Sequence, residues 1–221
     1  MRLPLSYSPS QNRPADYLAE VIETATTEFL AQCLEPDDLK FATMPPFGSW
    51  VKSWDEESGN QIYAVVYHVT TSPIDSVHRA RALGMSLEDL REQQPQIFAM
   101  LKTEFRAAIV GFERSPQSRT NRDLSATIHQ HLPPRPPQIH QAVHACSADE
   151  VLQFSEQLEF LRTLLQVTAA PVDALLAATL RDIYQLRKGD RAWLVQAGRM
   201  LSLILKDDYD RLQIILSQVY L

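Results

Sequence analysis

The 221-residue sequence contains only two cysteines, Cys33 and Cys146, which stand far apart and form no Cys-x-x-Cys pair. This scarcity argues against a disulfide framework and against a thiol redox pair. No run of the chain reaches the roughly 18 uncharged apolar residues that a membrane helix requires, and the N-terminus lacks the continuous apolar core of a signal peptide. We therefore expect a soluble, cytoplasmic protein with no membrane-inserted segment.

The sequence also lacks an excess of basic residues. Its formal net charge is -6, and acidic residues outnumber basic ones in both parts of the chain, by 17 to 13 over residues 1–145 and by 10 to 8 over residues 146–221. A surface that follows a phosphate backbone needs clustered Lys and Arg. Direct contact with nucleic acid is therefore not expected.

Catalytic motifs are missing as well. None of the six glycines begins a GxxxxGK[ST] pattern, whose backbone N–H groups and lysine hold the phosphates of a nucleotide. The chain has no Gly-x-Ser-x-Gly nucleophile elbow, and His144 and Cys146 lie too close in sequence to be read as a papain-like pair. A P-loop ATPase is excluded, and we expect neither a catalytic function nor a bound cofactor.

The hydrophobic content of the whole sequence is 45%, which is enough for a sizeable core, and strand patterns dominate its first half. Between Leu18 and Leu34, β-branched residues favour two short strands or one bent strand over a single helix, because three threonines within four positions penalise a helix. Residues 61–70 have apolar side chains at both alternating sets of positions, as in a closed barrel or a sandwich. The polar connector Asp55–Asn60 predicts a hairpin between this segment and residues 49–54.

A helical segment interrupts the strands. Residues 75–94 change to a helical period, and Ser86–Asp89 has the spacing of a capping box with an Asp in its third position. Phe105–Phe112 is apolar and compact and is predicted as a closing strand, with a helix over residues 97–108 as the alternative. These patterns predict an α+β protein that begins with a small antiparallel β-barrel carrying an inserted helix.

The second half reads differently. Pro133–Pro137 holds four prolines around Arg135 and predicts an extended, polyproline-like strap, which is either a spacer or a band across a folded unit. Ser147–Glu150 is a capping box, and the apolar spacing after it predicts four helices in a compact bundle. The predicted division is a flexible N-terminus at 1–14, a β-barrel domain at 15–114, a Pro-rich linker at 115–146 and a helical bundle at 147–221.

Three apolar segments carry a family resemblance. They read Pro-Pro-Phe-Gly-Ser-Trp-Val at residues 45–51, Ile-Tyr-Ala-Val-Val-Tyr at residues 62–67 and Phe-Arg-Ala-Ala-Ile-Val-Gly-Phe at residues 105–112. The run from Leu18 to Phe112 resembles the HAS barrel, the small β-barrel at the front of HerA-type DNA translocases and of the catalytic subunits of rotary ATP synthases. The strap, with Ile139, His140 and Val143 after it, looks like the segment that joins that barrel to the ATPase core.

As a whole, the chain resembles a stand-alone HAS-barrel protein of the cyanobacterial type that lacks the ATPase core. Because no P-loop follows the strap, the ATPase residues of the family have no counterpart to carry over. The resemblance implies a barrel that mediates subunit contact or docks a partner, since this barrel forms a ring-shaped collar in its better-known hosts.

A cluster of histidines is the sharpest local pattern. Its members, together with one thiol, are His129, His131, His140, His144 and Cys146. Their imidazole and thiolate groups are zinc ligands by type, but the sequence has neither the paired cysteines of a structural zinc finger nor a HExxH helix. We therefore expect no metal, and we keep these five residues as the candidates if one is bound.

Two tryptophans and one arginine are candidates for contact with a partner. Trp50 and Trp54, four residues apart on a strand, face the same side. On an exposed barrel face such rings anchor a peptide or stack on bases, whereas in a core they only pack. Arg135 among its prolines could fit an aromatic-lined groove, or the strap could dock on its own protein.

The sequence thus favours a non-enzymatic interaction or assembly module, in which the barrel and the helical bundle dock protein partners or self-associate. Two alternatives remain open. One is an accessory factor of a DNA-processing or translocase complex, and the other is a metal-dependent hydrolase centred on the cluster from His129 to Cys146.

Overall fold

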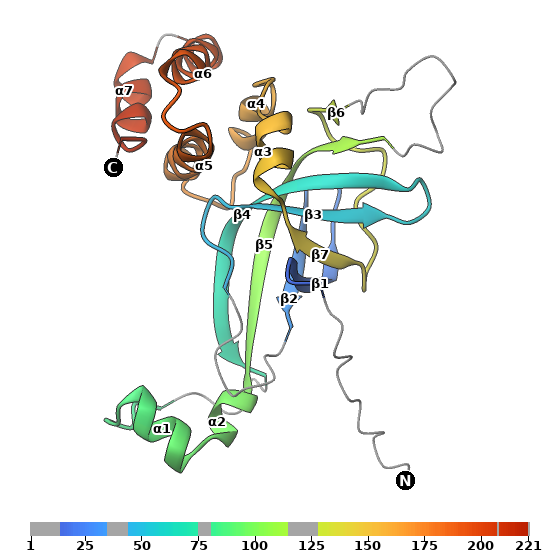
Figure 1. The fold of residues 1–221 in the computed structure, drawn as a ribbon, viewed down its shortest axis with the longest axis vertical. Coiled ribbons are helices and arrows are strands. Elements are labelled where there is room, and N and C mark those ends of the chain that lie inside the picture. The colour runs from blue at the N-terminus through green and yellow to red at the C-terminus, as the bar shows by residue number, and fades with distance from the viewer. Residues whose placement is uncertain (1–13, 35–43, 75–80, 115–127, 207, 221) are drawn as a thin grey trace.

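The computed structural model describes residues 14–34, 44–74, 81–114, 128–206 and 208–220 (Figure 1). Its strands are β1 (Tyr17–Thr24), β2 (Glu28–Cys33), β3 (Trp50–Asp55), β4 (Asn60–Pro73), β5 (Leu101–Glu113), β6 (Ile128–His129) and β7 (Ala142–Ala145). Its helices are α1 (Leu87–Gln93), α2 (Gln96–Ala99), α3 (Ala148–Phe154), α4 (Phe160–Leu164), α5 (Val172–Leu186), α6 (Arg191–Ile204) and α7 (Tyr209–Ser217). The predicted α+β class, with an N-terminal antiparallel barrel, is confirmed.

Six antiparallel strands close the barrel in the order β2-β1-β7-β3-β4-β5, and β2 pairs with β5 to complete the ring. The two short strands predicted between Leu18 and Leu34 are β1 and β2, paired as a hairpin. The predicted hairpin around Asp55–Asn60 is β3 and β4, with Asp55 directly opposite Asn60. Closure matters because a strand at an open edge would leave its N–H and C=O groups unpaired.

The sixth barrel strand comes from the segment predicted as a linker. β7 lies between β1 and β3, with Val143 opposite Ala19 and Ala145 opposite Val51. Prolines cannot donate to a strand ladder, so Pro133–Pro137 lies outside the sheet, between the paired strands β6 and β7. The predicted division into domains remains a prediction, but residues 142–145 of the predicted linker are part of the barrel.

Alternation along β4 explains why both of its faces are apolar. Ile62, Ala64 and Val66 belong to the cluster inside the barrel, together with residues of every other barrel strand. Tyr63 and Val65 belong instead to a second cluster, which contains the buried residues of the helices. One face of β4 therefore fills the barrel, and the other packs against α3, α4 and α5.

The C-terminal part has five helices in the described residues after β7, where the sequence predicted four. The apolar stripe that predicted one long helix is divided between α3 and α4, although its members Phe154, Leu158 and Leu161 are all buried. The break falls at Ser155, which is buried and whose carbonyl oxygen accepts a hydrogen bond from Trp193 Nε1 at 2.8 Å. This carbonyl bonds across to α6 instead of continuing α3, and the capping box predicted at the start of α3 is confirmed.

The inserted helical segment stands at the end of a long β ribbon. β4 and β5 pair from Gln61–Glu113 to Pro73–Leu101, and their last three rungs run past Glu104, where the pairing of β2 with β5 ends. We call the described residues 71–74 and 81–103 the arm, which comprises these last three rungs with α1 and α2. Its predicted Ser86 cap is confirmed, because the Ser86 side chain accepts from the N–H of Asp89 at 3.1 Å.

The alternative helix over residues 97–108 is wrong, since only α2 is helical there and β5 begins at Leu101. The first part of the predicted helical segment, residues 75–80, lies outside the described residues, as do residues 1–13 of the predicted flexible N-terminus. Among the helices of the described residues, none is long and apolar enough to cross a bilayer.

Candidate interaction surfaces

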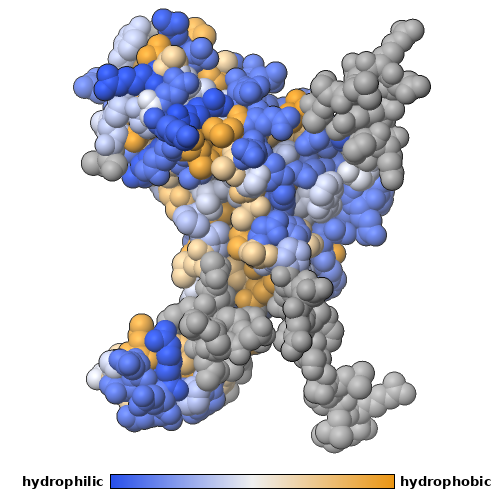
Figure 2. Space-filling view, viewed as in Figure 1, coloured by the Kyte–Doolittle hydropathy of each residue, from blue (hydrophilic) through white to orange (hydrophobic). Residues whose placement is uncertain are grey.

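The arm presents apolar side chains to solvent at its far end. These side chains are about half exposed, and they are Ile74, Leu83, Leu87 and Met100. Figure 1 shows α1 and α2 beyond the barrel, at the opposite end of the molecule from α6 and α7. Figure 2 shows that hydrophobic residues also gather over the narrow middle of the molecule, whereas the helical end is mostly hydrophilic. The end of the arm is the first candidate surface.

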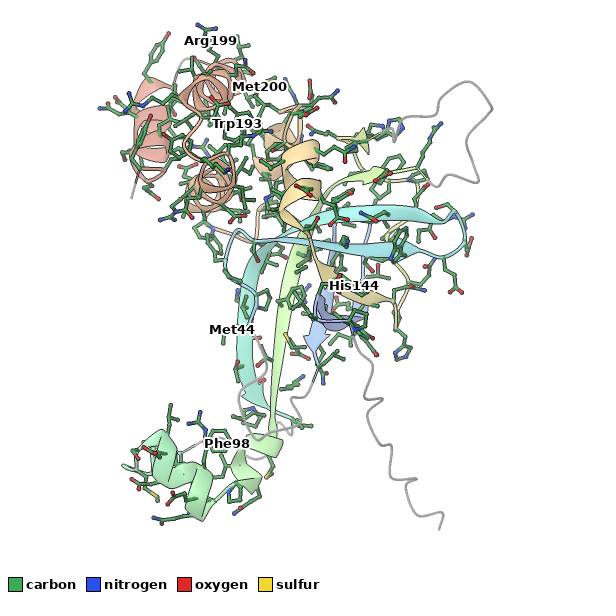
Figure 3. The ribbon with its side chains drawn as sticks, viewed as in Figure 1. Met44, Phe98, His144, Trp193, Arg199 and Met200 are labelled. Carbon is green, nitrogen blue, oxygen red and sulfur yellow. The ribbon has the colours of Figure 1, made fainter. Side chains whose placement is uncertain are left out.

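Few internal contacts hold the arm. α1 has seven residues and buries none of them, although a helix of this length is marginal in water without packing. Phe98 on α2 is buried, and the guanidinium of Arg91 lies 5.7 Å from the centre of its ring. Figure 3 shows Phe98 at the far end of the arm. Within the described residues, the leucines of the arm therefore have no internal core to cover them.

A cavity of about 290 Å³ lies where the barrel meets the helices, and it is the second candidate. Pro45, Pro46 and Trp50 line it from the barrel side, and Asp182 and Leu186 line it from α5. The remaining lining residues are Leu18, Met44, Ser49, Ala145, Cys146, Ala148 and Val151. Its walls are therefore mainly apolar, with one carboxylate from a helix.

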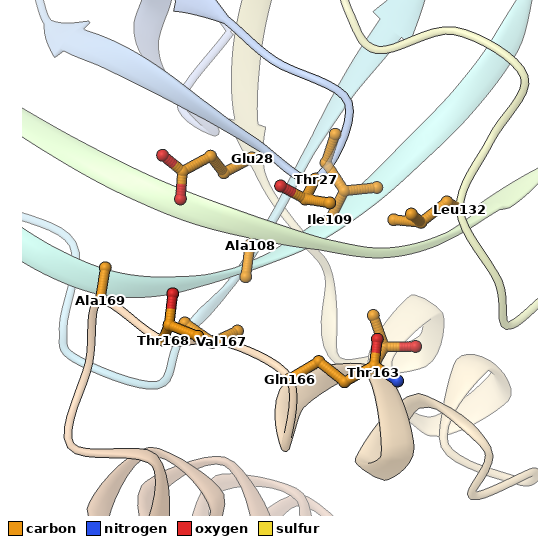
Figure 4. Close-up of a pocket in the computed structure, with 10 residues that line it drawn as sticks. All are labelled: Thr27, Glu28, Ala108, Ile109, Leu132, Thr163, Gln166, Val167, Thr168 and Ala169. Carbon is orange, nitrogen blue, oxygen red and sulfur yellow. The ribbon is translucent and has the colours of Figure 1, made fainter.

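A smaller cavity of about 180 Å³ lies between the barrel and the segment after α4 (Figure 4). Its carboxylate is Glu28, which accepts a hydrogen bond from the Tyr67 hydroxyl and one from Arg106 Nη1 at 3.1 Å. Burial and the hydrogen bond to Glu28 raise the pKa of Tyr67 to about 12. Because the charge of Glu28 is already matched from within the protein, this cavity offers little to a charged ligand.

Of the two predicted tryptophans, Trp50 lies in the core and Trp54 at the surface. Trp50 is 4% exposed, and its ring centre lies 5.1 Å from that of Phe154 and 5.3 Å from that of Phe160. Trp50 therefore ties the barrel to the helices. Trp54, on the same strand, is 40% exposed, so a role in partner contact stays a prediction for Trp54.

Arg135 in the strap pairs with Glu57 in the β3–β4 turn, and both side chains are more than half exposed. The strap thus contacts its own barrel through this pair. Exposed ion pairs of this kind add little stability. Because its side chain is more than half exposed, Arg135 is accessible. Its predicted role toward a partner also stays a prediction.

The structure divides the histidine cluster into separate environments. The ring of His129 stacks on Phe112, with 4.9 Å between centres, and His131 meets the same ring edge-on at 5.4 Å. Burial, aided by Arg114 and His131, lowers the pKa of His129. These two histidines therefore pack on Phe112 near the end of β5.

The other members of the cluster lie elsewhere. His144 on β7 stacks on Tyr17, with 5.2 Å between ring centres, and its Nδ1 lies 3.2 Å from a carboxylate oxygen of Asp16 (Figure 3). His140 is in the loop before β7. Cys146 follows β7 directly, and burial raises the pKa of its thiol. Within the part of the chain that the structure describes, no three of the His, Cys, Asp and Glu residues form a group that could hold a metal ion.

Sequence reasoning missed Asp182 and the leucines of the arm. Asp182 stands directly before the buried Ile183 in α5, and this position at the edge of an apolar stripe was the available signal. Leu83 and Leu87 were read only as part of a segment with a helical period, without a prediction of whether they face the core. What the sequence did not indicate is that the ribbon would carry them away from that core.

Comparison with known proteins gave one family match. The family model described as the HAS barrel domain matches residues 18–114. A search of curated proteins found no match to the chain. The matched range begins at the second residue of β1, contains β2 to β5 and ends before β7.

Proposed function

This chain is a HAS-barrel domain protein, and we propose that it is a non-enzymatic assembly module in which the arm of one copy docks on the arm of a second copy. The observation that carries this proposal is the exposed apolar end of the arm, formed by Ile74, Leu83, Leu87 and Met100. Exposed apolar groups of this kind mark contact surfaces in proteins that are otherwise soluble.

The resemblance supports a second copy as the partner, since the HAS barrel builds collars from several subunits in its better-known hosts. Geometry supports the arm as the point of contact. In an isologous contact the same residues of two copies cover each other, so no second surface is required. α1, which buries none of its own residues, would then gain the packing that a short helix needs.

The size of the apolar surface at the end of the arm determines the expected strength of association. Full burial of a Leu, Ile or Met side chain is worth roughly 1.5–3 kcal/mol. The four side chains are already about half buried, so covering the rest gives each copy roughly 4 kcal/mol. Two copies together gain roughly 8 kcal/mol, which is within the estimated range of the cost of association. We therefore expect a reversible association that depends on concentration.

Light scattering after size-exclusion chromatography tests the proposal. The wild-type mass should rise above the 25.1 kDa of one chain as concentration increases, and the double variant Leu83→Ser, Leu87→Ser should stay at one chain. The matched control is Leu203→Ser, because Leu203 lies on α6 and is 78% exposed. This variant should associate like the wild type. A wild-type protein that stays at 25.1 kDa at every concentration refutes the proposal, as does a control that dissociates equally.

The two other functions considered from the sequence have no specific observation in their favour. An accessory role in DNA processing stays a prediction of the family resemblance. A hydrolase centred on the histidine cluster is less supported than before, because His129 and His131 pack on Phe112 while His144 packs on Tyr17.

A further inference from the structure

The cavity between the barrel and α5 contains a carboxylate that the fold leaves without a partner. Asp182 is half-buried, and neither a hydrogen bond nor an ion pair to its side chain is found among the residues that the structure describes. Burial alone raises its pKa. The carboxylate of Glu28, at the smaller cavity, is by contrast bound by Arg106 and Tyr67.

Such a carboxylate is costly unless something outside the fold compensates it. A charged group that leaves water without a partner loses hydration, and buried charges in proteins are as a rule paired. Two bases, Arg187 of the helical part and Lys52 on β3, are engaged elsewhere. Arg187 donates to the carbonyl oxygen of Leu152 and to Ser155, and Lys52 pairs with Glu150 at 2.6 Å.

The rest of the cavity wall suits an apolar stem. Pro45, Pro46 and Leu186 contribute aliphatic surface, and Trp50 contributes an indole ring. The wall therefore combines one anionic group with an indole and with hydrocarbon, within a volume of about 290 Å³.

We propose that this cavity binds the side chain of a lysine from a protein partner, with its ammonium group on Asp182 and its methylene stem along Pro45, Pro46 and Leu186. A long aliphatic side chain with a charged head fits a wall that is apolar along its length and anionic at one point. The inference shares with the proposed function only the premise that the partner is a protein chain. It does not depend on the arm.

Nuclear magnetic resonance of the full chain tests this proposal, and the reporter is the indole N–H signal of Trp50, a residue that lines the cavity. The probe is Nα-acetyl-lysine methylamide, and its neutral analogue is Nα-acetyl-norleucine methylamide. We expect a saturable shift of the Trp50 signal with the lysine probe. Asp182→Asn should weaken its apparent affinity about tenfold or more, since hydrogen bonds to charged groups are the strong ones.

The matched control is Glu156→Gln, which makes the same change of charge at an exposed position that does not line this cavity. It should bind the lysine probe like the wild type. Equal binding of the norleucine probe, or an unchanged affinity in Asp182→Asn, overturns the proposal. Absence of any saturable shift with the lysine probe also overturns it.

A third probe, 1,5-diaminopentane, separates a lysine side chain from a free amine. Stronger binding of the diamine than of the lysine probe would assign the cavity to free polyamines and overturn the proposal of a protein partner. Because these probes are small and the readout is local, a failure here is distinct from a failure of the arm to associate. A protein that associates through the arm but ignores lysine rejects this inference alone.

Discussion

Phe154 joins the barrel to the helices, and its removal should destabilise both. Its ring is 1% exposed. Its centre lies 5.1 Å from that of Trp50 on β3, 5.0 Å from that of Tyr63 on β4 and 5.9 Å from that of Phe160 on α4. All three distances lie in the range of favourable aromatic pairs, roughly 4.5–7 Å.

The magnitude follows from this packing. Replacing a buried Phe with Ala costs roughly 3–5 kcal/mol, and each aromatic pair adds about 0.5–1.5 kcal/mol beyond the area it buries. With three pairs lost at once, we expect Phe154→Ala to lower the free energy of unfolding by about 5 kcal/mol, at the upper end of that range. A domain is stable by only about 5–15 kcal/mol, so the variant should be close to unfolding.

Urea denaturation, followed by both tryptophan fluorescence and circular dichroism, measures this loss. Phe154→Leu keeps most of the volume and should lose about 1–2 kcal/mol, while Leu203→Ala, at an exposed position of α6, should stay within about 0.5 kcal/mol of the wild type. A loss below about 1 kcal/mol in Phe154→Ala would refute the view that this ring couples the barrel to the helices.

Two further predictions concern a glycine and a carboxylate. A Cβ on Gly111 would lie 2.4 Å from the carbonyl oxygen of His129 and 2.8 Å from Phe154 Cζ, so Gly111→Ala should cost about 1–3 kcal/mol in a urea melt. Its control, Gly198→Ala in α6, meets only Leu216 at 3.5 Å and should stabilise by up to about 1 kcal/mol; equal effects of the two changes would contradict this reasoning. Asp182→Asn should raise the thermal midpoint at neutral pH, because the pKa of Asp182 is raised in the folded state and its charged form therefore opposes folding. This gain should disappear as the pH falls through the raised pKa and then the unfolded pKa of the carboxyl; a gain that persists in acid would show that charge is not its cause.

Local patterns in the sequence predicted most of the elements because they follow from neighbouring residues. The alternation at residues 61–70 predicted β4, and the spacing from Ser147 to Glu150 predicted the cap of α3. The break between α3 and α4 could not be predicted in this way. It depends on Ser155 bonding to Trp193, which lies far along the chain and whose position follows only from the packed fold.

The candidate surfaces were harder to predict for the same reason. Whether an apolar residue is buried depends on what packs against it, so Leu87 and Phe154 look alike in the sequence although only Phe154 is buried. Trp50 and Trp54 share a face of one strand, yet helices cover Trp50 and leave Trp54 partly open. Asp182 is a candidate binding residue because it lines a cavity between the barrel and α5, and this cavity follows only from the packed fold.

The late position of β7 in the chain has a consequence for synthesis. When the ribosome has completed residues 18–114, β7, the strand between β1 and β3, has not yet been synthesised. The nascent sheet therefore stays open between β1 and β3 until Ala145 has been added. N-terminal domains generally fold first during synthesis, but this barrel cannot close until residues 142–145 have been made. A fragment that ends at residue 114, where the family match ends, would therefore leave β1 and β3 each with an unpaired edge.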